Sequence, residues 1–256
     1  MTESMKPLRN ERPSSHTSVL RVFYGAYVWS MFFVLALGTT LTAAVLPGIE
    51  RRRRLARAAS RTMLRLAGMP VVVKSEERIP AGQCVIVANH ASYLDGLVMT
   101  AALPPRFGFV IKREMSRVPL AGLLLRRLGS QFVERFNRTQ GAADARRMMR
   151  NAVNGHSLVF FPEGTFSLQP GLLKFHTGAF VAAARARCPV VPAVVRGTRK
   201  ALAPRTAWPR PSRIEVEILP ALSATAGKDE NATIELRDRA RNAILSELRE
   251  PDLSVA

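Results

Sequence analysis

A histidine and a carboxylate lie close together in the segment Asn89-His90-Ala91-Ser92-Tyr93-Leu94-Asp95-Gly96. Histidine is the side chain best suited to accept a proton near neutral pH. A carboxylate that accepts the Nδ1–H of the imidazole fixes its tautomer and leaves Nε2 free to take a proton from a substrate. On one continuous helix, the spacing of His90 and Asp95 would point them in different directions. We therefore expect His90 in a loop and Asp95 in the first turn of the next helix, where the chain can fold back and bring them together.

The same segment also has a purely structural interpretation. Ser92-x-x-Asp95 has the spacing of a capping box, so Asp95 could serve only to satisfy a helix start, and His90 could be an ordinary loop residue. Cys84 and Cys188 each lie in or beside an apolar run, as small core residues do, and no serine nucleophile motif is present. If the segment is catalytic, the pattern favours direct attack by an activated hydroxyl over a covalent acyl-enzyme.

A second candidate is the turn Phe161-Pro162-Glu163-Gly164-Thr165-Phe166, which follows an apolar run. Glu163, Gly164 and Thr165 offer a carboxylate, a permissive backbone and a hydroxyl close together. Such a turn can bind the hydroxyls of an acceptor, and its backbone N–H groups can bind an oxyanion or a phosphate. Judged alone, it could equally be an ordinary turn between a strand and a loop.

Cationic side chains form the third group. Lys112 and Arg113 follow an apolar run, and Arg135 lies in the segment 129–135. Arginine suits bidentate binding of a phosphate, and lysine supplies a point charge. In so basic a chain, however, any single cation is more often a surface charge.

These residues must be positioned by the elements around them. Short β-branched runs alternate with helix-like stretches after Gly68, which predicts an α/β domain built on a buried mixed sheet flanked by helices. We expect strands at 71–73, 84–88, 107–111, 158–161, 190–195 and 214–218. We expect helices at 92–102, 119–127, 142–153, 177–187 and 233–249. The candidate residues then lie at strand ends, where such domains tend to place their sites.

The N-terminal region has a different character. We expect a flexible tail over residues 1–21, a membrane segment with a basic helix over 22–67, and the α/β domain over 68–256. No charged residue occurs from Val22 to Ile49, which is long enough to cross a bilayer at about 20 residues. The segment could span as one helix or return as a helical hairpin around Gly38-Thr39-Thr40. Burial in a soluble core is the alternative, and a cleaved signal peptide fits less well.

The charge balance predicts a polyanionic partner. Lys and Arg number 38 against 19 for Asp and Glu, which leaves a formal charge of +19. Arg51–Arg54 directly follow the apolar segment, and Arg57, Arg61 and Arg65 continue a basic stripe at helical spacing. Such a stripe would meet anionic headgroups and place the domain on the cytoplasmic side, although it could also be a solvated helix face. Nucleic acid is not expected as a partner, because aromatic residues are few and not interleaved with the basic ones.

The order of these motifs resembles the glycerolipid acyltransferase family, whose members include lysophosphatidic acid acyltransferases. The resemblance covers about residues 70–200. It is carried by Asn89-His90-x4-Asp95, Lys112-x-Glu114 with Pro119 and Gly122, Phe132-x-x-Arg135, Phe161-Pro-Glu-Gly-Thr165, and Val191-Pro192 with Gly197-Thr198.

The resemblance implies roles for the candidate residues. His90 would be the general base and Asp95 its orienting partner. Lys112 and Arg135 would bind phosphate, while Glu163, Gly164 and Thr165 would help to seat the acceptor. The family's acyl donor is acyl-CoA or acyl carrier protein, its acceptor is a lyso-glycerolipid, and no metal or other cofactor is implied.

The chain departs from the family at one position. Many lysophosphatidic acid acyltransferases carry arginine after Glu-Gly-Thr, where this chain has Phe166. The acceptor is then either a lipid without a phosphate monoester or one whose phosphate is bound by Arg135, Lys112 or Lys174. We expect lysophosphatidic acid to be accepted, because Arg135 matches the family pattern. The sequence leaves open the acyl-chain length, the choice of donor and the oligomeric state.

Overall fold

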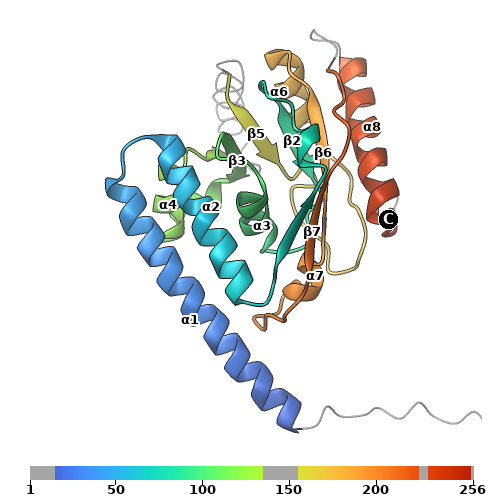
Figure 1. Ribbon diagram of the computed structural model, residues 1–256. Helices are drawn as coiled ribbons and strands as arrows, with labels where there is room; N and C mark the ends of the chain where they lie inside the picture. The colour runs from blue at the N-terminus through green and yellow to red at the C-terminus, as the bar shows by residue number, and fades with distance from the viewer. Residues whose placement is uncertain (1–14, 135–154, 225–229, 255–256) are drawn as a thin grey trace, which may run out of the picture.

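The computed structural model describes residues 15–134, 155–224 and 230–254 (Figure 1). Within them, seven strands form one sheet in the order β1-β7-β6-β2-β5-β3-β4. The strands are β1 (Val71–Lys74), β2 (Val85–Ala88), β3 (Phe107–Lys112), β4 (Gln131–Val133), β5 (Ser157–Phe160), β6 (Val190–Arg196) and β7 (Ile214–Ile218). Neighbours pair in parallel except β6 and β7, which are antiparallel. The predicted mixed sheet flanked by helices is confirmed.

The strand pairing places the candidate residues together at the carboxyl ends of the parallel strands. Strands β2, β3, β4, β5 and β6 run in the same direction, so their carboxyl ends lie together. All six predicted strands are present, each within a residue of its expected bounds. The sequence analysis missed β4, a three-residue strand at the end of the sheet whose Phe132 pairs with Ile111 of β3.

Helices cover both faces of the sheet. They are α1 (Ser15–Val45), α2 (Ile49–Leu66), α3 (Asp95–Ala102), α4 (Ala121–Arg127), α6 (Gly178–Ala186), α7 (Thr198–Ala201) and α8 (Glu230–Leu248), with 3₁₀ turns η1 (Glu76–Arg78) and η2 (Arg113–Arg117). The predicted helix at 142–153 lies outside the described residues. The short α7 was not expected.

Strand β2 shows how the two faces are packed. All four of its residues are buried, and successive side chains point to opposite faces. Ile86 and Ala88 join the core formed with α2 and α3, while Val85 and Val87 join the core formed with α6 and α8. Figure 1 shows α2 and α3 on one side of the sheet and α8 on the other. Because both faces are covered, the strand is a continuous apolar run.

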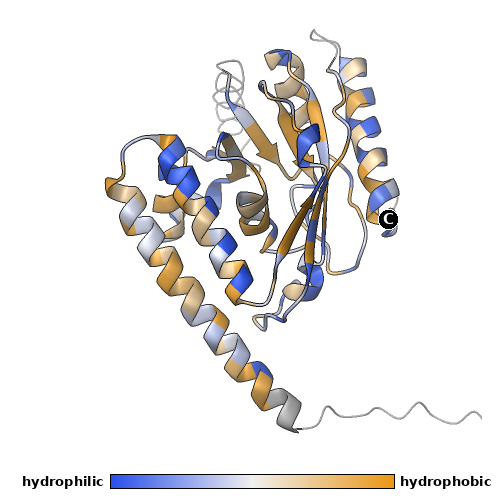
Figure 2. Ribbon diagram, in the orientation of Figure 1, coloured by the Kyte–Doolittle hydropathy of each residue, from blue (hydrophilic) through white to orange (hydrophobic). Residues whose placement is uncertain are grey.

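Helix α1 is one continuous helix, so of the two alternatives that the sequence left open, the single helix is present and the hairpin around Gly38-Thr39-Thr40 is not. The chain turns instead at residues 46–48, and α2 runs back along α1 (Figure 1). The helix also begins at Ser15, inside the expected flexible tail. By length and composition, Val19–Val45 could cross a membrane. Figure 2 shows mostly orange to white residues along α1 and several strongly hydrophilic residues on α2.

Helix α1 packs against α2 and α4, and two hydrogen bonds from its N-terminal half tie it to the domain. The hydroxyl of Tyr24 donates to the carbonyl of Ala67 at 2.5 Å, and the indole N–H of Trp29 donates to the carbonyl of Ala207 at 2.7 Å. Gly25 permits this approach, because a Cβ there would lie 2.7 Å from the ring of Trp208. The helix therefore has one face on the domain and one face uncovered.

Several of the basic residues of α2 form hydrogen bonds within the fold, which neither interpretation of the basic stripe included. Arg53 donates to the carbonyls of Leu128 and Arg106, at 2.9 and 2.8 Å. Arg57 and Arg61 donate to carbonyls at the C-terminal end of α3. Burial lowers the pKa of the Arg53 guanidinium. At the end of α3, the arginines satisfy helix carbonyls that have no partner within their own helix.

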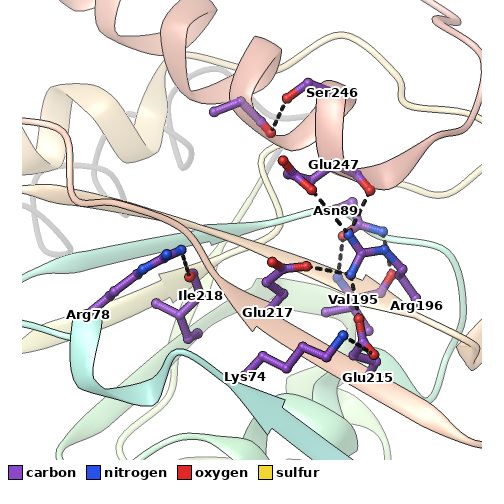
Figure 3. Close-up of polar contacts among 11 residues, drawn as sticks. Lys74, Arg78, Asn89, Val195, Arg196, Glu215, Glu217, Ile218, Ser246 and Glu247 are labelled. Carbon is purple, nitrogen blue, oxygen red and sulfur yellow. Dashed lines mark hydrogen bonds and ion pairs between the residues drawn. The ribbon is translucent and has the colours of Figure 1, made fainter.

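An ion-pair network joins β1, β6, β7 and α8 (Figure 3). Nη1 of Arg196 donates to Glu215 and to Glu217 at 2.8 Å each, and its Nη2 donates to the carbonyl of Glu247 at 2.6 Å. Lys74 pairs with Glu215 at 2.8 Å. The network fixes the end of β6, which is where one wall of the candidate site begins.

Candidate active site

The chain folds back after β2, and His90 and Asp95 meet. Nδ1 of His90 lies 2.8 Å from Oδ2 of Asp95, whose side chain is fully buried at the first position of α3. The same oxygen accepts the N–H groups of Ala91 and Ser92, at 2.6 and 2.8 Å. The sequence offered two interpretations of Asp95, as the partner of His90 and as a helix cap, and the same carboxylate oxygen does both.

This geometry has a chemical consequence. With Nδ1 donating to a carboxylate, the remaining ring nitrogen, Nε2, is the one that can accept a proton. The imidazole is about one-fifth exposed and can contact a ligand, while the side chain of Asp95 is shielded from solvent. A buried negative charge beside the ring stabilises the imidazolium that proton transfer would form.

Asn89 holds this loop against the neighbouring strand. Its side-chain amide donates to the carbonyl of Val195 at 2.9 Å and accepts the Val195 N–H at 2.7 Å (Figure 3). Asn89 is buried, so both hydrogen bonds are shielded from water. The ends of β2 and β6 are thereby locked together directly beside His90.

Glu163 binds the backbone of His90. Its Oε1 accepts the backbone N–H of His90 at 2.5 Å, and its Oε2 accepts the N–H of Leu173 at 2.9 Å. Only 3% of Glu163 is exposed. Both carboxylate oxygens therefore accept backbone N–H groups, so Glu163 can help to seat the acceptor through the loops that it joins. Beside it, Gly164 adopts a φ of 74°, and Thr165 is exposed at the surface of the turn.

Burial raises the pKa of Glu163 to about 7. Hydrogen bonds from the N–H groups of Leu173 and His90 oppose that shift, the charge of Asp95 adds to it, and the charge of Arg199 lowers the pKa. The carboxyl thus titrates near neutral pH, in direct contact with the backbone of the candidate base.

Aromatic rings enclose the imidazole. Phe161 stacks on His90 at 4.5 Å between ring centroids, and Phe166 meets it edge-on at 4.7 Å. Tyr93 packs on Phe166 at 4.8 Å and is 69% exposed. The side chain at the position of the departure from the family pattern is therefore in contact with the candidate base.

The cations predicted to bind phosphate do not contact His90 in the described residues. Lys112 ends β3 and is exposed, and Lys174 is exposed on the loop after Glu163. Arg135 lies outside the described residues. The sequence analysis missed Arg199, which is half-buried in α7 and close enough to Glu163 to influence its charge. Its signal was its place directly after the Gly197-Thr198 motif at the end of a buried strand.

Comparison with known proteins identifies the family. The family model described as Acyltransferase matches residues 70–196, which include every candidate site residue expected from the sequence. The chain belongs to the acyltransferase family. The 1-acyl-sn-glycerol-3-phosphate acyltransferase of Saccharomyces cerevisiae is 27% identical over 242 residues, which cover 90% of this chain and 80% of that protein.

Other members of the acyltransferase family show the same similarity over less of their length. The 1-acyl-sn-glycerol-3-phosphate acyltransferase alpha of Mus musculus is 30% identical over 188 residues, covering 72% of this chain and 66% of that protein. The Haemophilus influenzae 1-acyl-sn-glycerol-3-phosphate acyltransferase is 33% identical over 132 residues, which cover 49% of this chain and 55% of that protein. The chain thus spans between about half and four-fifths of these relatives.

The fold is also that of a solved acyltransferase. The crystal structure of the 1-acyl-sn-glycerophosphate (LPA) acyltransferase PlsC from Thermotoga maritima superposes with a TM-score of 0.75 at 20% identity. The match covers 91% of this chain and 96% of that one. It therefore extends beyond the sheet to most of the N-terminal helices.

Proposed function

We propose that this protein transfers a fatty acyl group from a thioester donor to the free hydroxyl of a lyso-glycerolipid, with lysophosphatidic acid as the acceptor and phosphatidic acid as the product. The observation that carries the proposal is the contact between His90 and buried Asp95 at the edge of the sheet. Family membership and the names of the relatives support this acceptor.

In the proposed reaction, Nε2 of His90 takes the proton of the acceptor hydroxyl as its oxygen attacks the thioester carbonyl. A C–O bond forms, and the negative charge passes to the carbonyl oxygen of a tetrahedral intermediate. That intermediate collapses with cleavage of the C–S bond, and the imidazolium returns the proton to the leaving thiolate. Asp95 stabilises the imidazolium, and Glu163 holds the His90 backbone in place.

The donor and the phosphate contacts belong to the same proposal. The donor is acyl-CoA or acyl carrier protein, and both are anionic partners suited to a chain with a charge of +19. Lys112 and Arg135 are proposed to bind phosphate because they match the family motifs, and Gly164 and Thr165 to line the acceptor site. No metal or other cofactor takes part in the proposed steps.

A second acceptor class has one observation in its favour. Phe166 places an apolar ring against His90 where many lysophosphatidic acid acyltransferases have arginine. A lyso-lipid without a phosphate monoester would fit that environment without burying a charge of nearly −2.

We further propose that α1 and α2 hold the protein in a membrane with the catalytic domain on the cytoplasmic side. The uncovered apolar face of α1 and the arginines that follow it support this placement. The anionic surface of that leaflet would be contacted by the exposed members of the basic stripe, Arg51, Arg54, Arg61 and Arg65.

The lipid products of the purified full-length protein test the proposed function. The protein would be given acyl-CoA with lysophosphatidic acid, lysophosphatidylcholine or monoacylglycerol. The proposal expects the highest kcat/KM for lysophosphatidic acid. A higher kcat/KM for either of the other two lipids would show that lysophosphatidic acid is not the preferred acceptor. Thioester hydrolysis without any acylated lipid would instead identify a thioesterase.

A further inference from the structure

The inference begins at α7, which lies between the two loops that form the candidate site. Ser92, in the loop of His90 and Asp95, donates its hydroxyl to the carbonyl of Leu202 at 2.7 Å. On the other side, Nη1 of Arg199 donates to the carbonyls of Ser167 and Leu168, at 2.7 and 3.3 Å. The Arg199 guanidinium is thus fixed to the backbone directly after Phe166.

The polar groups at this junction are incompletely satisfied. Across the described residues, three buried side-chain atoms have no hydrogen-bond partner: Oδ1 of Asp95, Oγ1 of Thr198 and Nε of Arg199. Asp95 begins α3 directly after the His90 loop, and Thr198 and Arg199 belong to α7. Native proteins rarely leave such groups without a partner, so each is a candidate contact for a bound ligand, ion or water. Two of these three atoms are hydrogen-bond donors suited to an anionic oxygen.

The Arg199 guanidinium also has nitrogen atoms that donate no hydrogen bond to the described residues. Among the described residues, only its Nη1 donates hydrogen bonds. Its charge acts on Glu163, whose Oε1 contacts the backbone of His90. Positive charge therefore reaches the environment of the base from α7, although the turn after Glu163 carries Phe166 in place of arginine.

We propose that Arg199 binds the phosphate of the acceptor and so determines specificity in place of the arginine missing at Phe166. This inference rests on the proposed function and deepens it. A planar guanidinium binds a phosphate monoester through charge-assisted hydrogen bonds. Phe166 then serves as an apolar wall against His90, and the cation approaches the same loop from the neighbouring helix.

The alternative is that Arg199 only fastens the loop at Ser167 and Leu168. Arg199→Gln distinguishes the two roles, because the amide can still donate to a carbonyl but carries no charge. Lys200→Gln is the matched control, since Lys200 is the exposed neighbour in the same helix and loses the same charge. Arg199→Lys, which keeps the charge but lacks the planar fork, provides a second variant should the glutamine variant fail to fold.

The direct test is the dissociation constant of glycerol 3-phosphate for the full-length protein in detergent, with glycerol as the neutral control. We expect wild type and Lys200→Gln to bind glycerol 3-phosphate alike, and Arg199→Gln to bind it about 10- to 100-fold more weakly, the usual effect of losing a charged hydrogen bond. Arg199→Lys should fall between them. Equal binding by Arg199→Gln and Lys200→Gln, or no preference of wild type over glycerol, would overturn the proposal.

Acyl transfer provides the second test and separates this inference from the proposed function. Arg199→Gln should raise KM for lysophosphatidic acid and leave thermal stability close to that of Lys200→Gln. Adding Phe166→Arg to Arg199→Gln should restore much of the lost kcat/KM, because a guanidinium returns to the same loop. A uniform loss with all acceptors, without rescue, would indicate the fastening role. A wild type that binds glycerol 3-phosphate but acylates no lipid would refute the proposed function alone.

Discussion

At the scale of single residues, Asp95 combines two roles that a sequence reader would treat as alternatives. One oxygen accepts the imidazole N–H of His90 and two backbone N–H groups, so the residue both shapes the loop and orients the ring. A catalytic effect and a stability effect should therefore both follow its replacement, in proportions that depend on the substitute.

Asp95→Asn should lower kcat by about 10²–10⁴, because the neutral amide no longer stabilises the imidazolium. The loss of unfolding free energy should be modest, about 1 kcal/mol, because the amide oxygen can still accept backbone N–H groups. Asp95→Ala should cost more stability, since it leaves those buried donors unpaired. Turnover and urea unfolding of both variants check this. Near-normal turnover by Asp95→Asn would reduce Asp95 to a cap.

Glu163 predicts a pH dependence of stability. Its folded-state pKa of about 7 lies above the ordinary value of 4.5, so the folded state binds the extra proton between these values. Its contribution is present below about pH 4.5 and is lost as pH rises toward 7, by up to about 3 kcal/mol. The unfolding free energy of wild type should therefore fall relative to that of Glu163→Gln as pH rises across that window. A constant difference from pH 4.5 to 7.5 would contradict the assignment.

At the scale of elements, the C-terminal segment supports the loop that holds Glu163. Arg241 of α8 donates to the carbonyls of Leu172 and Leu173 at 2.8 and 3.0 Å, and both of its terminal nitrogens pair with Asp252. Leu173 in turn donates its N–H to Glu163. A chain of contacts thus runs from α8 through the loop to the backbone of His90.

Replacing Arg241 should consequently affect both stability and turnover. Arg241→Met leaves the two carbonyls without their donor and should destabilise the fold by about 1–3 kcal/mol, the usual cost of leaving buried polar groups unpaired. Arg237→Met is the control, because Arg237 on the same helix pairs only with its neighbour Asp238 among the described residues. Urea unfolding and kcat of the two variants decide the matter. Equal stability of the two would show that the C-terminal segment does not brace the loop.

Several elements could be predicted from the sequence because their signals are local. The strand Ile214–Ile218 is an alternating run, and its predicted bounds match the structure. The loop geometry at His90 followed from the spacing to Asp95 and the strand before it. By contrast, the contacts of Glu163 with the N–H groups of His90 and Leu173 could not be predicted, because those groups lie far away in the sequence or in another loop. The hydrogen bonds of the α2 arginines could not be predicted either, because their carbonyl partners come from distant helices.

At the scale of the whole molecule, α1 lies along the domain with one apolar face uncovered. Phe23 and Val34 are each 70% exposed, and Leu41 is 61% exposed. Exposed apolar surface of this extent marks an interaction with lipid or protein. The same helix is bound to the carbonyls of Ala67 and Ala207 through Tyr24 and Trp29, so the proposed membrane anchor is also a part of the domain.

Charging the uncovered face of α1 should release the protein from membranes. In Phe23→Asp/Val34→Asp/Leu41→Asp, each carboxylate costs about 2.5–3.5 kcal/mol at a buried membrane position. The fraction that floats with vesicles should fall sharply, while circular dichroism stays unchanged. The corresponding triple alanine variant, which keeps the face uncharged, should remain largely bound. Undiminished flotation of the aspartate variant would place the membrane contact elsewhere.

His90 is proposed to be the general base of acyl transfer, and the turnover of His90→Ala shows whether it is. The assay would use the full-length variant, acyl-CoA and lysophosphatidic acid, in a preparation whose thermal unfolding matches that of wild type. We predict a fall in kcat of at least about 10²–10⁴, the usual contribution of a general base. Near-normal transfer by a folded His90→Ala protein would contradict the claim.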